Sequence, residues 1–174
     1  MLLKLLKKAS NMISIEYLLN DPLTPDLKSS ISVPISANNP NFFVKGWNGN
    51  KVSEIQKQAA QVYACMHVVT NMIKNFHGTS FKWSSVESLN VIPRAGNGIN
   101  AFYDRASLQF FYGINPINKR LAFTCDSLNV VAHEYGHAFL DSIRPDLWNT
   151  AALEIFSFHE AFGDIISMLS TLCN

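Results

Sequence analysis

A run of apolar residues at helical spacing constrains the fold of this 174-residue chain more than any other feature. From Val52 to Phe76, apolar side chains recur at steps of three and four residues, which places them on one face of an α-helix. Ser53 can cap the first turn, and Gly78 stands just past the last one. We therefore expect residues 52–76 to form one helix whose apolar face packs on the core.

The remaining segments predict an α+β fold around that helix. They are an amphipathic helix at 1–20, loop with a short strand near 41–45 in residues 21–50, short strands and turns at 81–123, and helices at about 127–142 and 150–172. The strand candidates are residues 91–92, 100–103, 108–112 and 121–124. The length favours one domain overall.

Composition and charge exclude several classes of protein. Hydrophobic residues make up 48% of the chain and charged residues 16%, which rules out disorder. The net charge of +1 gives no basic excess for binding nucleic acid. No apolar run approaches the ~18 residues of a membrane helix. Lysines interrupt the N-terminal leucines, so no secretory signal is visible and a cytoplasmic location is the default expectation. The cysteines, three and widely spaced, predict reduced core residues.

The segment His133-Glu134-Tyr135-Gly136-His137 is the strongest indication of function. Two residues four apart share one face of a helix, so both imidazoles can reach one ion. Neutral imidazole nitrogens suit Zn²⁺. Glu134 stands one step round the helix, where it can take a proton from water without binding the metal. The pattern predicts a zinc hydrolase, and its alternative is an ordinary helix with two structural histidines and an exposed glutamate.

The last predicted helix adds two carboxylates at helical spacing. Glu160 lies 23 residues after His137, which leaves room for a loop and a helix that returns antiparallel to the first. Glu160 can then supply a third metal ligand, leaving one position open for water. Asp164, one turn on, can accept the free N–H of a ligating histidine. Ala161 and Gly163 are small and allow the two helices to approach closely.

Two other residues compete for the metal. His159 is an alternative third ligand, but it points about 100° away from Glu160, so only one of them faces the ion. Asp141 lies four residues past His137 and can also reach the metal face.

At this point the chain resembles the gluzincin metallopeptidases, specifically the thermolysin-like family. The His133-Glu134-x-x-His137 motif followed by Glu160-x-x-x-Asp164 carries the resemblance. Residues 100–103 and 111–113 are similar to the family's substrate-binding edge strand and the strand after it. The likeness covers about residues 52–170.

The resemblance implies a zincin-like metallopeptidase domain at 51–174, preceded by an N-terminal segment at 1–50. It implies Zn²⁺ as cofactor, a peptide as substrate, and peptide-bond hydrolysis as activity. His133, His137 and Glu160 would be the zinc ligands, Glu134 the base, and Asp164 the partner of a ligating histidine. The peptide would add as a strand along Asn100, Ala101 and Tyr103.

The chain also departs from the family. The family's catalytic domain continues past the point matching Asn174, and its continuation supplies a histidine and an arginine that bind substrate. Trp148 stands near the family's oxyanion-stabilising tyrosine, and Asn129 replaces a calcium-binding aspartate. These departures keep alternatives open: a zinc-bound module that acts in binding, with a partner covering its C-terminal side, or hydrolysis of another amide or ester.

Overall fold

The computed structural model describes residues 12–18, 28–35, 39–49, 54–78 and 81–173, and its elements confirm the α+β class. The helices are α2 (Glu54–His77), α3 (Leu128–Ile143) and α4 (Leu153–Leu172), with 3₁₀ turns η1 (Thr124–Asp126) and η2 (Leu147–Asn149) before α3 and α4. The strands are β1 (Met12–Leu18), β2 (Lys28–Pro34), β3 (Phe42–Val44), β4 (Leu89–Ile92), β5 (Ala101–Tyr103), β6 (Ser107–Phe110), β7 (Tyr112–Ile114) and β8 (Leu121–Phe123).

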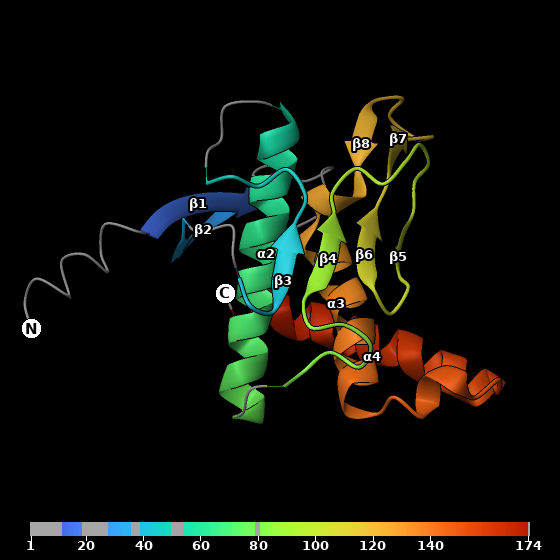
Figure 1. The fold of residues 1–174 in the computed structure, drawn as a ribbon. Coiled ribbons are helices and arrows are strands. Elements are labelled where there is room, and N and C mark those ends of the chain that lie inside the picture. The colour runs from blue at the N-terminus through green and yellow to red at the C-terminus, as the bar shows by residue number, and fades with distance from the viewer. Residues whose placement is uncertain (1–11, 19–27, 36–38, 50–53, 79–80, 174) are drawn as a thin grey trace, which may run out of the picture.

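Four strands form the central sheet in the order β3-β4-β6-β5. The first three are parallel, and β5 runs antiparallel to β6, so β5 is an edge strand. Figure 1 shows this sheet in front of α2 and α3, with the β7-β8 hairpin above its β5 side. The sheet and the helices enclose the core, and β5 lies against α3 with one edge open.

The long helix α2 lies where the sequence predicted, but the expectation of a single buried face is wrong: every residue from Gln58 to Met66 is buried, so the middle of the helix is enclosed on all sides. It packs against β1 and α3. Between α2 and α3, the hydroxyl groups of Thr70 and Tyr135 hydrogen-bond at 2.9 Å. The helix ends where expected, because Gly78 adopts a φ of 74° and its N–H donates to the carbonyl of Lys74. The expected cap, Ser53, lies outside the described residues.

The predicted N-terminal helix is wrong for residues 12–18, which form strand β1. Ile15 and Tyr17 are buried while Glu16 between them is exposed, an alternation of period two that fits a strand. β1 pairs antiparallel with β2 over its whole length, and β2 lies in the segment predicted as loop. Residues 1–11, with the leucine and lysine stripe, lie outside the described part of the chain.

Helices α3 and α4 occupy the predicted segments. The side chain of Ser127 caps α3 by accepting a hydrogen bond from the N–H of Val130. α4 crosses behind and below α3 in Figure 1 and packs against it more extensively than against any other element. Among the described residues, no helix combines the length and apolar character needed to span a bilayer.

Candidate active site

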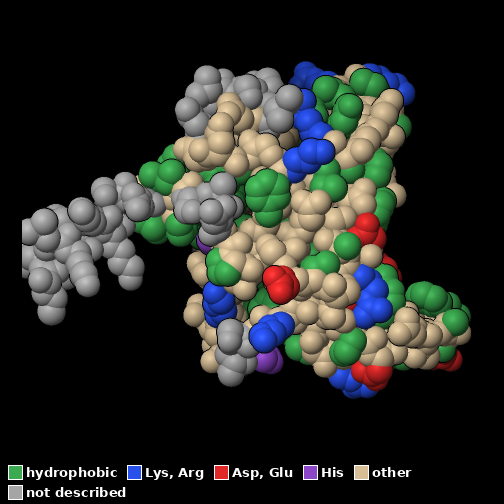
Figure 2. Space-filling model, viewed as in Figure 1, with side chains coloured by type: hydrophobic (Ala, Val, Ile, Leu, Met, Phe, Trp, Pro, Cys, Tyr) green, Lys and Arg blue, Asp and Glu red, His purple; other side chains and the backbone are tan. Residues whose placement is uncertain are grey.

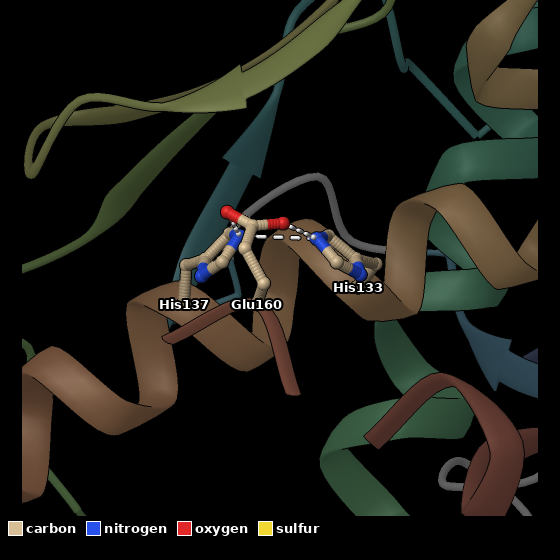
Figure 3. A group of neighbouring side chains, drawn as sticks. All are labelled: His133, His137 and Glu160. Atoms are coloured by element: carbon tan, nitrogen blue, oxygen red, sulfur yellow. Dashed lines mark hydrogen bonds and ion pairs between the residues drawn. The ribbon is translucent and has the colours of Figure 1, made fainter. Parts of the chain in front are cut away.

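Three side chains from α3 and α4 converge on one point. His133 and His137 lie one turn apart on α3, and Glu160 reaches them from α4, with its carboxylate between the two rings (Figure 3). The Nε2 atoms of the two histidines are 3.1 Å apart. Glu160 Oε2 lies 3.3 Å from His133 Nε2, and Oε1 lies 3.6 Å from His137 Nε2. The three side chains predicted as metal ligands therefore lie together in one cluster.

The spacing of these atoms fits zinc. A tetrahedral ion with bonds of about 2.0–2.1 Å needs ligand atoms about 3.3–3.4 Å apart. The separation of the two Nε2 atoms is 3.1 Å, and the two oxygens of Glu160 lie 3.3 and 3.6 Å from them, so the distances lie on both sides of that value. Two neutral imidazoles and one carboxylate are also the donor set of catalytic zinc sites that keep a fourth position open. The residues present can hold Zn²⁺ without rearrangement of either helix.

Asp164 fixes the orientation of one histidine. Its Oδ1 lies 3.0 Å from Nδ1 of His133, where it can accept the ring N–H. A proton held on Nδ1 leaves the lone pair of Nε2 free to point at Glu160 and His137. The structure thus brings Asp164 to the position that the sequence predicted.

Two glycines allow the helices to come close enough for this cluster. A Cβ atom at Gly136 would lie 2.9 Å from the Cα of Gly163. A Cβ at Gly163 would lie 2.9 Å from Cε1 of the His133 ring. The prediction of close approach is correct for Gly163, whereas Ala161 is exposed and lies away from the crossing.

Glu134 lies beside the cluster rather than in it. Glu134 is 7% exposed, and this burial raises the pKa of its carboxyl group to about 7. The nearby His133 lowers that pKa, and the nearby Glu160 raises it further. The backbone N–H of Tyr103 also donates to this carboxylate. Glu134 is therefore a buried carboxyl group with a raised pKa in the metal-free protein, and it lines the same cavity as the three ligands.

The edge strand β5 passes over the cluster. The N–H of Phe111 donates to the carbonyl of Asn100, and the N–H of Asp104 to that of Ser107, so the even-numbered residues of β5 bond to β6. By the alternation of an antiparallel ladder, the backbone groups of Ala101 and Tyr103 point to the open edge. Ala101 lies where an added strand can bond to it. The carbonyl of Asn100 accepts the hydrogen bond from Phe111, and the substrate-binding role predicted for Asn100 stays a prediction.

Asp141 does not face the metal ligands, which corrects one alternative. It is fully buried and accepts a hydrogen bond from the hydroxyl of Tyr103 at 2.9 Å. Arg105 donates to both of its oxygens, from Nε at 3.2 Å and from Nη2 at 3.1 Å. Asp141 therefore ties β5 to α3. The sequence did not reveal this network, because nothing near Asp141 in the chain marks Tyr103 or Arg105 as its partners.

His159 stands outside the ligand cluster, so the alternative of His159 as third ligand has no support in this geometry. It is buried, its ring lies 5.9 Å from that of His137 and 5.9 Å from that of Trp148, and burial lowers its pKa. A cavity of about 320 Å³ opens between these rings and the ligands.

Comparison with known proteins places this chain in a family. A sequence model described as the thermolysin metallopeptidase catalytic domain matches residues 14–141, which include most of β1 and most of α3. Among curated proteins, none matches the chain significantly.

Proposed function

Since the chain belongs to the thermolysin metallopeptidase family, we propose that it is a zinc-dependent peptidase whose metal is held by His133, His137 and Glu160. The observation that carries this proposal is the convergence of the two Nε2 atoms and the Glu160 carboxylate, at separations of 3.1 to 3.6 Å that lie close to those of tetrahedral zinc ligands. When bound, zinc supplies a Lewis acid that makes water acidic near neutral pH and polarises a carbonyl. Residues of the chain itself are proposed to transfer the proton of the attacking water and to bind the peptide substrate.

Glu134 is the proposed general base. Its carboxylate takes the proton of the water that attacks the scissile carbonyl carbon and then delivers that proton to the leaving amine. The pKa of about 7 supports this role, because a group that titrates near the working pH can both accept and release a proton. Asp164 is the proposed positioning partner of His133.

The peptide substrate is proposed to add as a strand to the open edge of β5. The backbone groups of Ala101 face that edge, and the backbone N–H of Tyr103, two residues on, donates to Glu134. Main-chain hydrogen bonds to Ala101 would hold the peptide in register over the metal ligands.

A quenched peptide library tests the proposal. Zinc-loaded protein should cleave peptides, and a chelator should abolish the cleavage until zinc is restored. Glu134→Ala should keep one zinc per chain and lose about 10²–10⁴-fold in rate. Glu154→Ala, an exposed glutamate in the first turn of α4, is the matched control and should cleave at the parent rate. Parent-like cleavage by Glu134→Ala would contradict the proposed base.

A second candidate is a zinc-bound module that binds a partner without hydrolysis. The observation that favours it is the apolar surface of α4, where Leu153 is 78% and Leu172 79% exposed. Figure 2 shows hydrophobic side chains grouped at the end of α4 that projects from the molecule. Zinc binding with no cleavage of any library peptide would favour this candidate over the peptidase.

A further inference from the structure

The hairpin of β7 and β8 carries exposed apolar side chains that the proposed function does not use. Ile114, Ile117 and Leu121 are between 55% and 82% exposed. Ile114 and Leu121 are cross-strand partners, so their side chains lie on one face of the hairpin, and Ile117 stands in the loop between the strands. We call these three residues the apolar tip, and none of them lines the cavity beside the metal ligands. Exposed apolar side chains that are grouped in this way mark an interaction surface.

The loop that carries Ile117 satisfies its backbone N–H groups internally. The side-chain oxygen of Asn115 accepts hydrogen bonds from the N–H groups of Ile117 at 2.8 Å and Asn118 at 3.4 Å. The backbone carbonyl of Asn115 accepts the N–H of Lys119 at 2.9 Å, and its own N–H donates to the carbonyl of Arg120 at 2.8 Å. The N–H of Arg120 donates to the side-chain oxygen of Asn118 at 3.0 Å. Because removing an unpartnered polar group from water costs free energy, a loop bonded in this way leaves water at low cost.

Two basic side chains stand beside the apolar tip. Lys119 and Arg120 lie in the loop just before Leu121, both are exposed, and neither forms an ion pair with another described residue. The sequence has no acidic residue between Asp104 and Asp126. Figure 2 shows Lys or Arg side chains next to hydrophobic ones at the end of the molecule where Figure 1 places this hairpin. The surface is therefore both apolar and positively charged, and it complements a surface that is apolar and negatively charged.

From this combination we propose that the β7-β8 hairpin docks on an anionic lipid membrane. The apolar tip enters the boundary between the headgroups and the acyl chains, and Lys119 and Arg120 contact the acidic headgroups. The inference goes beyond the proposed function and does not rest on it, because neither zinc nor catalysis takes part.

The shape of the apolar tip favours a lipid surface over an acidic protein. A strand rises about 3.3 Å per residue, so Ile114 and Ile117 lie within about 10 Å of each other along the hairpin. Interfacial apolar side chains enter a membrane to a depth of about 5–10 Å, which accommodates the whole tip. A hairpin end needs a matching groove on a protein partner, whereas a lipid surface deforms around it. The internal bonds of the loop also avoid unsatisfied N–H groups inside the lipid.

The hairpin is fixed to the rest of the molecule at its base. The rings of Tyr112 and Phe123, one on each strand, lie 5.6 Å apart, and the Arg94 guanidinium lies 4.5 Å from the Phe123 ring. The N–H of Gly98 donates to the carbonyl of Tyr112 at 2.8 Å. A two-stranded hairpin alone is only marginally stable in water, so these contacts hold the tip in one orientation. Little conformational freedom is then lost when the tip docks.

Co-sedimentation with lipid vesicles tests the proposal. Each basic side chain near an anionic surface contributes about fivefold, so vesicles with about 30% phosphatidylserine should bind the protein about 25-fold more tightly than phosphatidylcholine alone. Lys119→Ala/Arg120→Ala should remove that difference. Ile117→Asp should weaken binding to the anionic vesicles at least tenfold, because it takes an apolar side chain out of the interface. Leu153→Asp, a matched change at a similarly exposed position of α4, should bind like the wild type.

A second variant measures insertion of the tip directly. When anionic vesicles are added, Ile117→Trp should show tryptophan emission at shorter wavelength once the wild-type emission is subtracted. An unchanged emission in the sedimented protein overturns the proposed insertion.

The remaining outcomes are equally decisive. Absence of binding to anionic vesicles overturns the proposal, as does an equal loss of binding in Ile117→Asp and Leu153→Asp. Binding to soluble polyglutamate without binding to vesicles also overturns it and assigns the hairpin to an acidic protein partner. Since no arm of the experiment uses zinc or cleavage, each result holds whether or not the protein is a peptidase.

Discussion

Replacing Gly136 with alanine should push apart the two helices that carry the metal ligands. The new Cβ would lie 2.9 Å from the Cα of Gly163 and 3.3 Å from the Cβ of Ile166. Carbon atoms pack at about 3.5–4.0 Å, and a backbone atom cannot rotate away, so α3 and α4 must separate by about 0.6 Å. The edges that join His133 and His137 to Glu160 would widen by a similar amount.

The expected magnitudes follow from two opposing terms. Overpacking costs about 1–3 kcal/mol, and alanine in a helix regains about 1 kcal/mol relative to glycine. The net loss of about 1 kcal/mol should lower the melting temperature of the metal-free protein by about 2–4 °C. Zinc affinity should fall at least tenfold, comparable to the loss of a residue that orients a ligand.

Calorimetry of the metal-free protein and competition with a chelating dye measure the two effects. Gly78→Ala is the control, because Gly78 has a φ of 74° with no atom within 4 Å of a built Cβ. It should cost about 1–2 kcal/mol through backbone strain and leave zinc affinity unchanged. If Gly136→Ala bound zinc like the parent and melted at a higher temperature, the crossing of α3 and α4 would not control the metal site.

Three further changes test other parts of the structure. Asp164→Asn should weaken zinc binding about 10–100-fold in a dye competition, with little change in melting temperature, because it disturbs only the partner of a ligand. Asp141→Ala should cost about 3–5 kcal/mol in urea unfolding, since it strips a buried partner from Tyr103 and Arg105. Burial lowers the pKa of His67 from 6.5 to about 4, so the unfolded chain binds the proton first as the pH falls. His67 should therefore account for a loss of about 2 kcal/mol in the free energy of unfolding between pH 7 and pH 5. His67→Gln should remove that share and leave the smaller pH dependence that comes from other buried histidines, such as His159.

The helices and the ligand pattern could be predicted because their signals are local. Apolar residues at steps of three and four identified α2, and the helices predicted at about 127–142 and 150–172 match α3 and α4 to within a few residues. The spacing of His133 and His137 fixes their relation on any helix, whatever the helix packs against. Among the residues of α4, helical spacing alone left Glu160 and His159 as candidates, because the crossing of α4 with α3 decides which face meets the metal.

The features that the sequence did not reveal depend on partners far away in the chain. β1 is a strand because β2 supplies its hydrogen-bond partners. The sequence suggested an amphipathic helix there because the lysines and leucines that precede β1 follow a helical pattern. Asp141 shares a helix face with His137, yet Arg105 and Tyr103 from the β5 region bind it instead. Such a choice depends on which element packs beside the helix, and helical spacing carries no information about that.

The candidate site has two parts, and a different kind of observation supports each. His133, Glu134 and His137 lie within the residues that match the family, whereas Glu160 and Asp164 lie beyond them. The contact of Gly136 with Gly163 joins one half to the other at a distance that only two glycines allow. Two histidines on α3 that had only a structural role would not require α4 to approach so closely. The convergence of the third ligand and its neighbour on the same point is therefore independent support for a metal site.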